Sequence, residues 1–215
     1  FARGQGLDPA DLYVLETAKG DYVAAKKAIA GKQTEALIAA ALPEILRGLP
    51  MPKRMKWGRE AEAFVRPVHT LVAIFGQRVI DVTFAGVQSG RDAAGHRFFG
   101  EPIPLLTADF NLYVALLRVQ HVMVDPVERR AAILAGAEAL AEEVGGTLVD
   151  DPKTLDTVTW LVEWPFPLLG TFAPEFLEIP DEVTIITLRE HQKLFTIRGP
   201  DGKLINRFVA VANTL

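Results

Sequence analysis

Apolar residues recur at helical spacing in several separate stretches of this chain. From Gln33 to Leu49 they include Leu37, Ala41 and Ile45, which lie four residues apart. This spacing predicts a helix that ends at the glycine and proline that follow and packs one face against a sheet.

A second apolar stripe runs from Ile133 to Val144 and predicts a longer helix. Asp125-Pro126 supplies its start signal, a capping carboxylate followed by proline, and Gly145-Gly146 supplies its end. The same kinds of cap and proline signals predict four further helices: a short one after Asp8-Pro9, one from Thr107 to Val119, a short one after Asp151-Pro152, and one over 180–193.

Runs of β-branched and aromatic residues between turn signals predict the strands. We expect a hairpin of 13–17 and 22–29, paired strands at 68–75 and 79–84, short strands at 121–124 and 147–149, and a closing hairpin around Asp201-Gly202 that joins 195–198 to 208–212. Pro102 and Pro104 bracket a short extended piece, whereas Pro165 and Pro167 predict a turn.

Helices and strands mix without regular alternation, which favours the α+β class with mixed, largely antiparallel sheets and packed helices. We expect residues 1–215 to form one α+β region, with a division into sub-modules 1–100 and 101–215 as the alternative. The chain starts with Phe1 rather than Met, so we expect it to be a piece of a longer protein.

Composition excludes several classes of protein but does not identify a function. Of the 215 residues, 49% are hydrophobic and 23% charged, as in ordinary globular proteins, and the net charge of -4 argues against a wholly basic nucleic-acid wrapper. The chain has no cysteine, which excludes thiolate catalysis and disulfides within it. No apolar run reaches the roughly 20 residues that a membrane helix needs. We therefore expect a cytoplasmic protein without a membrane span.

The residues show no catalytic or metal-binding pattern. Four histidines (His69, His96, His121 and His191) are too widely spread for a zinc motif, and Ser89 is one position away from nucleophile-elbow spacing. The carboxylate pairs fall where helix ends and loops are expected, so we interpret them as solvated charges. We predict no catalytic residue, no metal site and no cofactor bound by this piece.

Three sets of basic residues each lie beside an aromatic ring. They are Lys53, Arg54 and Lys56 with Trp57; Arg91, His96 and Arg97 with Phe98-Phe99; and His191, Gln192 and Lys193 with Phe195. Such groups suit phosphate oxygens and the stacking of bases. Composition alone favours the simpler interpretation, in which these are ordinary exposed cations beside core aromatics.

Six motifs in a fixed order carry a resemblance that extends over essentially the whole chain. They are Leu49–Gly58, Phe64–His69, Gly90–Phe98, Val124–Arg130, Leu161–Pro165 and Arg189–Phe195. In this order they strongly resemble the β subunit of the bacterial tetrameric glycyl-tRNA synthetase. The resemblance implies an N-terminal fragment of that subunit, and a fold similar to the editing-type module of the phenylalanyl-tRNA synthetase β subunit.

The resemblance also implies partners and a role. The partners are the tRNA for glycine and the α subunit in an α2β2 tetramer; ATP and Mg belong to the α subunit, so the isolated piece should be inactive. As tRNA-binding candidates it favours Lys53, Arg54, Lys56, Arg66, Arg91, His96, Arg97, His191 and Lys193.

Two other roles stay open. One is an assembly module whose apolar helix faces, around 112–119 or 133–144, dock other domains or the α subunit. The other is a vestigial or active deacylase, with His96 or His191 as the water-activating group. Glu163 is expected to be a buried carboxylate paired to an arginine, which would brace the fold without touching RNA.

Overall fold

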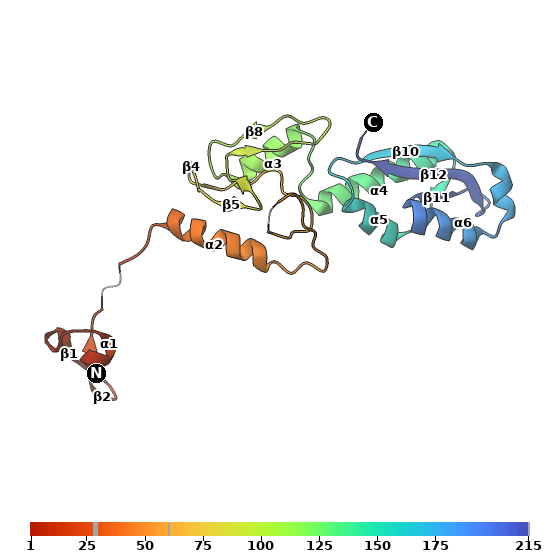
Figure 1. The fold of residues 1–215 in the computed structure, drawn as a ribbon. Coiled ribbons are helices and arrows are strands. Elements are labelled where there is room, and N and C mark those ends of the chain that lie inside the picture. The colour runs from red at the N-terminus through yellow and green to blue at the C-terminus, as the bar shows by residue number, and fades with distance from the viewer. Residues whose placement is uncertain (28–29, 60, 215) are drawn as a thin grey trace.

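The computed structural model describes residues 1–27, 30–59 and 61–214 (Figure 1). The helical elements are α1 (Ala2–Gln5), η1 (Pro9–Asp11), α2 (Thr34–Gly48), α3 (Phe110–Val119), α4 (Pro126–Glu143), α5 (Pro152–Thr159), η2 (Pro174–Glu178), α6 (Asp181–Thr187) and η3 (Leu188–Gln192). The strands are β1 (Leu12–Thr17), β2 (Gly20–Ala25), β3 (Ile74–Phe75), β4 (Arg78–Val79), β5 (Thr83–Phe84), β6 (Val87–Gln88), β7 (Asp92–Ala93), β8 (Ile103–Pro104), β9 (Thr147–Leu148), β10 (Phe166–Thr171), β11 (Phe195–Arg198) and β12 (Leu204–Ala212). The α+β class is confirmed.

The N-terminal hairpin is confirmed and stands apart from the rest of the chain in Figure 1. Strands β1 and β2 pair antiparallel, with Val14 opposite Val23. Asp8 caps η1 as predicted, because its side chain accepts a hydrogen bond from the backbone N–H of Ala10 at 2.9 Å. The last two residues predicted for the second strand, 28–29, lie outside the described residues.

Helix α2 packs on a compact set of short antiparallel ladders, as its apolar face predicts. Ala73, Ile80 and Val82 form the buried cluster, and Ile38 and Leu42 of α2 pack against it. The strands predicted at 68–75 and 79–84 are too long, since only β3, β4 and β5 form there. The chain turns after every few residues, so most of these residues have no partner strand.

Helix α3 covers the next cluster, in which Leu117 packs with Ile103 and Leu105. Its cap is Asp109 rather than the predicted Thr107: the Asp109 carboxylate accepts from Leu112 N at 3.0 Å. An aspartate two residues later competes for the same role because it caps at least as well as threonine. The apolar clusters do not separate at residue 100, because Ala93 packs with these residues; the domain boundaries themselves stay a prediction.

The strand predicted at 121–124 is wrong. His121 takes a left-handed backbone with φ 58° and ends the turn after α3, and α4 begins at Pro126. The backbone N–H of Met123 bonds to the carbonyl of Glu163 at 2.9 Å, so the segment is held as an extended link without a sheet.

A four-stranded antiparallel sheet in the order β10-β12-β11-β9 forms the C-terminal part. Helices α4 and α5 pack on it, and Ile133, Val158, Phe195 and Val209 are among the buried residues they share with the sheet. Figure 1 shows this layer of sheet and helices beside the smaller ladders. The closing hairpin of β11 and β12 and all the helices predicted for 125–193 are confirmed, with 180–193 divided between α6 and η3.

The turn predicted at Pro165 and Pro167 is wrong at its second proline. Pro167 lies within β10, opposite Val211. Strand β10 is at the edge of the sheet, where a residue without an N–H is tolerated. Gly136 of α4 faces this proline, and a Cβ there would lie 2.6 Å from Pro167 Cγ. A larger residue would therefore push the long helix away from the edge strand.

The chain after the N-terminal hairpin has two parts: α2, α3 and the short ladders form one, and the four-stranded sheet with its helices forms the other. Buried and aromatic side chains join these two parts. Arg129 of α4 donates to the carbonyls of Met123 and Thr159, the latter at 2.7 Å. Phe99 contacts Phe166 edge to face, with ring centroids 5.8 Å apart, and His121 contacts Trp164 at 5.4 Å. Glu163 is exposed, so its predicted role as a buried ion-pair partner is wrong.

No helix within the described part of the chain is long and apolar enough to cross a membrane.

Candidate nucleic-acid interface

The segment 49–66, called the basic loop below, connects α2 to the ladders. It contains five Lys or Arg residues and two Glu residues. Met55 and Phe64 close it: their backbone groups exchange two hydrogen bonds, Met55 N to Phe64 O at 2.8 Å and Phe64 N to Met55 O at 3.1 Å. Between them, the tip carries Lys56-Trp57-Gly58-Arg59, and Gly58 supplies the positive φ of 59°.

Two contacts hold this loop in place. The Phe64 ring packs edge to face on the buried ring of Phe84, with centroids 5.6 Å apart. Arg54 donates from Nη2 to the carbonyl of Leu49 at 2.5 Å, just past the end of α2. A cation in this position satisfies a carbonyl that the helix leaves without a partner. The loop is thus positioned by its own residues.

An ion pair adds a clamp between helix and loop. Arg47 in the last turn of α2 contacts Glu62 at 3.1 Å and also Glu44, one turn earlier, at 2.7 Å. The hydrogen bond from Arg47 lowers the pKa of Glu62, and the hydrogen bond to Glu62 raises the pKa of Arg47. The carboxylate therefore stays ionised to more acidic pH than an ordinary glutamate.

The remaining cations of the loop face solvent. Lys53, Lys56, Arg59 and Arg66 are exposed, whereas Trp57 is half-buried beside them. For Lys53, Lys56 and Arg66 the part of the chain that the structure describes contains no ion-pair partner. Of the first predicted set, then, Arg54 braces the loop while both lysines present their charge outward.

The second set divides more sharply. His96 is fully buried, stacks on Phe99 with ring centroids 4.9 Å apart, and accepts from the backbone N–H of Phe98 through Nδ1. Arg91 is half-buried. Arg97 is exposed and lies over the exposed ring of Phe98, 5.8 Å from its centroid. Arg97 and Phe98 are therefore the cation and ring of this set that face solvent most openly, since Phe98 is 66% exposed and Phe99 37%.

Two glycines explain why His96 points inward. A Cβ on Gly100 would collide with the backbone nitrogen of His96, and one on Gly95 would lie 2.8 Å from the Gln120 side chain. The loop wraps tightly around the end of α3, where His96 N donates to Gln120 O at 2.9 Å. Gly95 and Gly100, which make this motif recognisable in sequence, therefore allow the loop backbone to lie directly against the end of α3.

The third set belongs to η3, in the other part of the chain. Lys193 donates from Nζ to the carbonyl of Glu190 at 2.8 Å, and Lys153 pairs with the Glu190 carboxylate at 2.7 Å. The Lys153 hydrogen bond, helped by the charges of Arg189 and Lys193, lowers the pKa of Glu190. His191 is exposed, but Phe195 is buried in the core and cannot stack on a base.

Sequence reasoning missed Arg47, Arg59 and Arg129. Arg59 extends the exposed row of the basic loop and was visible as the residue after Trp57-Gly58. The i, i+3 spacing of Glu44 and Arg47 was a signal for the clamp, although Glu62 is distant in sequence. Arg129 gave no signal, since burial of one of two adjacent arginines depends on the tertiary contacts of α4.

Ser89, the one serine of the chain, is structural. Its hydroxyl donates to Ile80 O at 2.6 Å and accepts from Val82 N at 2.9 Å, both buried. Among the described residues, no group of three or more His, Cys, Asp or Glu is arranged to hold a metal ion.

Comparison with known proteins gives a consistent result over the full length. A family model described as glycyl-tRNA synthetase beta subunit matches residues 1–215. Similar curated proteins, named glycine–tRNA ligase beta subunit, include those of Nitratidesulfovibrio vulgaris, 44% identical over 99% of this chain, Geotalea daltonii, 40% identical over 100%, and Halalkalibacterium halodurans, 40% identical over 99%. The chain spans about 30% of the length of these relatives.

Proposed function

Because this chain belongs to the glycyl-tRNA synthetase beta subunit family, we propose that it is a non-catalytic part of glycine–tRNA ligase that contacts tRNA through the basic loop. The tRNA for glycine is then the substrate that it binds. Its protein partner is an α subunit, with which it forms an α2β2 tetramer. Adenylate chemistry with ATP and Mg belongs to that α subunit, and this region positions the tRNA.

The observation that supports the proposal is that exposed Lys and Arg side chains lie on a loop whose shape is fixed by contacts with the rest of the protein. Lys53, Lys56 and Arg66 lack ion-pair partners in the described part of the chain, while Arg54 and the Arg47–Glu62 pair hold the loop's shape. A loop whose shape is already fixed avoids the entropy cost of ordering its backbone when its cations bind phosphates. Arg97 over Phe98 offers a further cation with a ring for stacking.

The test replaces Lys53 and Lys56 with Ala in the full-length β subunit assembled with its α subunit. If both contact phosphates, the slope of log affinity against log salt for glycine tRNA should fall by about 1.5 to 2. The matched control replaces Lys19 and Lys203, which are exposed on the two hairpin turns, and should leave the slope unchanged. An unchanged slope in the Lys53 and Lys56 variant would contradict the proposal.

The assembly role is a second candidate with its own observation. Of the two helix faces expected to dock, the one around 112–119 is open, since Leu112 is 45% and Val119 70% exposed. On the face around 133–144, Ile133, Ala137 and Ala141 are buried in the core and cannot dock another domain. Deletion of this region should then abolish the tetramer before it affects tRNA affinity, which size-exclusion chromatography would report.

The editing role has less support from the geometry. His96, one of its two suggested water-activating groups, has no exposed surface through which a substrate can approach. The expected likeness to the editing-type module of the phenylalanyl enzyme stays a prediction. Release of free amino acid from mischarged tRNA by the complete enzyme would test the activity.

A further inference from the structure

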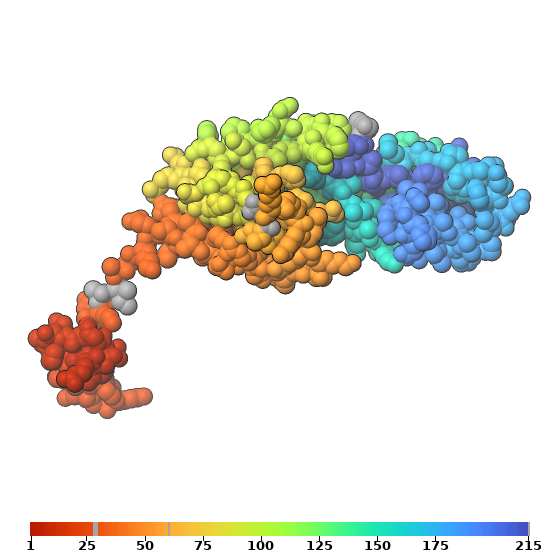
Figure 2. Space-filling view, in the orientation of Figure 1, coloured from red at the N-terminus to blue at the C-terminus, as the bar shows by residue number. Residues whose placement is uncertain are grey.

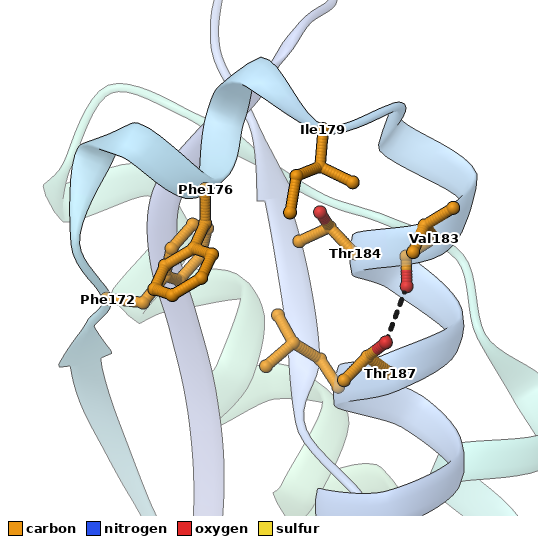
Figure 3. Close-up of a pocket in the computed structure, with 7 residues that line it drawn as sticks. Phe172, Phe176, Ile179, Val183, Thr184 and Thr187 are labelled. Carbon is orange, nitrogen blue, oxygen red and sulfur yellow. Dashed lines mark hydrogen bonds between the residues drawn. The ribbon is translucent and has the colours of Figure 1, made fainter.

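An open apolar groove lies at the end of the chain's C-terminal part, far in sequence from the basic loop. It has a volume of about 320 Å³ and is formed by η2, α6 and the residues that flank them. Figure 3 shows Phe172 and Phe176 on one side, and Ile179, Val183 and Thr187 on the other. Neither the basic loop nor the joint between the two parts of the chain contributes to it.

The groove presents apolar surface to solvent that the fold itself does not cover. Phe176 and Val183 are each 51% exposed, and Ile179 is 39% exposed. The Thr187 hydroxyl donates to Val183 O at 2.8 Å, so this polar group is already satisfied within the helix. A hollow of this volume, lined mainly by apolar side chains, has the size and character of a binding pocket.

The charge around the groove selects the kind of partner. The stretch 172–188 contains four acidic residues and no Lys, Arg or His. Glu175, Glu178 and Glu182 are exposed, while Asp181 is paired with Arg198 at 2.9 Å. Within the described residues these three glutamates have no ion-pair partner, and they belong to η2 and α6, the elements that form the groove. Negative charge on these elements disfavours a phosphate backbone and favours a segment that has apolar side chains flanked by Lys or Arg.

The size of the groove argues for a tethered occupant rather than a separate protein. A specific interface between independent proteins buries upwards of about 1,000 Å², far more than a hollow of this size can supply. A segment of the same polypeptide binds at high effective concentration and needs much less contact area. The curated relatives are about three times as long as this chain, so most of their subunit lies outside the region described.

We propose that this groove docks a basic amphipathic segment of the same β subunit, from the part of the subunit outside residues 1–215. The groove thereby fixes the C-terminal part of this region against the remainder of the subunit. The proposal does not depend on tRNA binding by the basic loop.

The experiment places a photo-reactive phenylalanine analogue at Phe176 in the full-length β subunit within the assembled enzyme. Mixed light and heavy isotope labelling separates cross-links within one chain from those between two copies. We expect a cross-link within the chain, to a peptide outside residues 1–215 that carries apolar residues beside Lys or Arg. Cross-links to the α subunit, to tRNA or to a second copy, or the absence of any cross-link, would overturn the proposal.

A pair of variants distinguishes docking from a general change in the protein. Val183→Lys puts a cation on the half-exposed groove wall and should lower the cross-link yield at Phe176 about tenfold, as expected for the loss of one buried valine contact. Val127→Lys makes the same change on α4, where Val127 is 74% exposed, and should leave the yield unchanged. Equal cross-link yields in the two variants would contradict the proposal. Both variants should bind glycine tRNA with unaltered affinity, so that a failure of this proposal can be told apart from a failure of tRNA binding by the basic loop.

Discussion

Arg129 and Arg130 are adjacent on α4, yet their environments differ. Arg129 is only 8% exposed, and its guanidinium donates to the carbonyls of Met123 and Thr159 and lies near the Trp160 ring. Arg130 instead reaches an exposed carboxylate of α5. The first arginine joins three segments of backbone, whereas the second forms an ion pair of the kind that adds little stability.

We therefore predict unequal effects of the same substitution. Arg129→Met should lower the free energy of unfolding by about 1 to 3 kcal/mol for each carbonyl left without a donor. Arg130→Met should change it by less than about 1 kcal/mol. Urea denaturation of the two variants measures the difference, and equal midpoints would show that Arg129 does not hold these segments together.

His96 shows how far sequence could lead at the scale of a residue. Its neighbours Arg91 and Arg97 and the rings at Phe98-Phe99 made this stretch a candidate polyanion site, which the family resemblance and not composition favoured. Gly95 and Gly100 then bring the backbone so close that the imidazole turns into the core. Residue type can be read from sequence, but side-chain direction in an irregular loop depends on contacts with α3.

Helices were predicted better than strands, and the reason is physical. The signals for α4 and α5, a capping aspartate followed by proline, lie within a few residues of each helix start. A strand needs a partner that is distant in sequence, and the segments at 68–71 and 121–124 have none. Pro167 was misjudged for the same reason, since only the strand order shows that β10 is at the edge.

The basic loop is held as an element by the Arg47–Glu62 clamp, whose strength should depend on pH. Because the pKa of Glu62 is lowered in the folded state, its contribution to stability is complete above the ordinary glutamate pKa of 4.5. That contribution is lost as the pH falls below this value and through the lowered folded-state pKa.

Carboxyl NMR titration checks this prediction. We expect Glu62 to titrate below 4.5 and Arg47→Met to return it to its ordinary range. Glu44→Gln, which removes the more exposed of the two carboxylates on Arg47, should leave the low pKa of Glu62 in place because the direct hydrogen bond from Arg47 is its largest cause. If the pKa of Glu62 is the same in the wild type and in Arg47→Met, the ion pair does not hold the loop.

At the scale of the whole molecule, aromatic rings connect the ladders to the four-stranded sheet. Phe99 stacks on His96 and meets Phe166 of β10 edge to face. Figure 2 shows the two parts in contact, with the N-terminal hairpin set apart from both. The Phe99–Phe166 contact joins segments more than sixty residues apart in sequence.

A double-mutant cycle measures this connection. Replacing Phe99 and Phe166 with Leu, singly and together, should give a coupling energy of about 0.5 to 1.5 kcal/mol in urea unfolding. The pair Phe98 and Phe166 serves as the control and should couple by less than about 0.5 kcal/mol. If the first pair couples no more than the control, the two parts unfold independently of this contact.

Sequence by itself determined the α+β fold class, the main helices, the aspartate caps of α4 and α5, and the closing hairpin, because these depend on local patterns. It also determined the family and the presence of a basic stretch, which depend on motifs in order and on residue type. Tertiary structure alone decided which cations remain available: it committed Arg54 and Lys193 to backbone carbonyls, buried His96, and left Lys53 and Lys56 facing solvent. It also assembled the apolar groove from η2 and α6. Burial and pairing depend on segments that meet only after folding, so no local pattern records them.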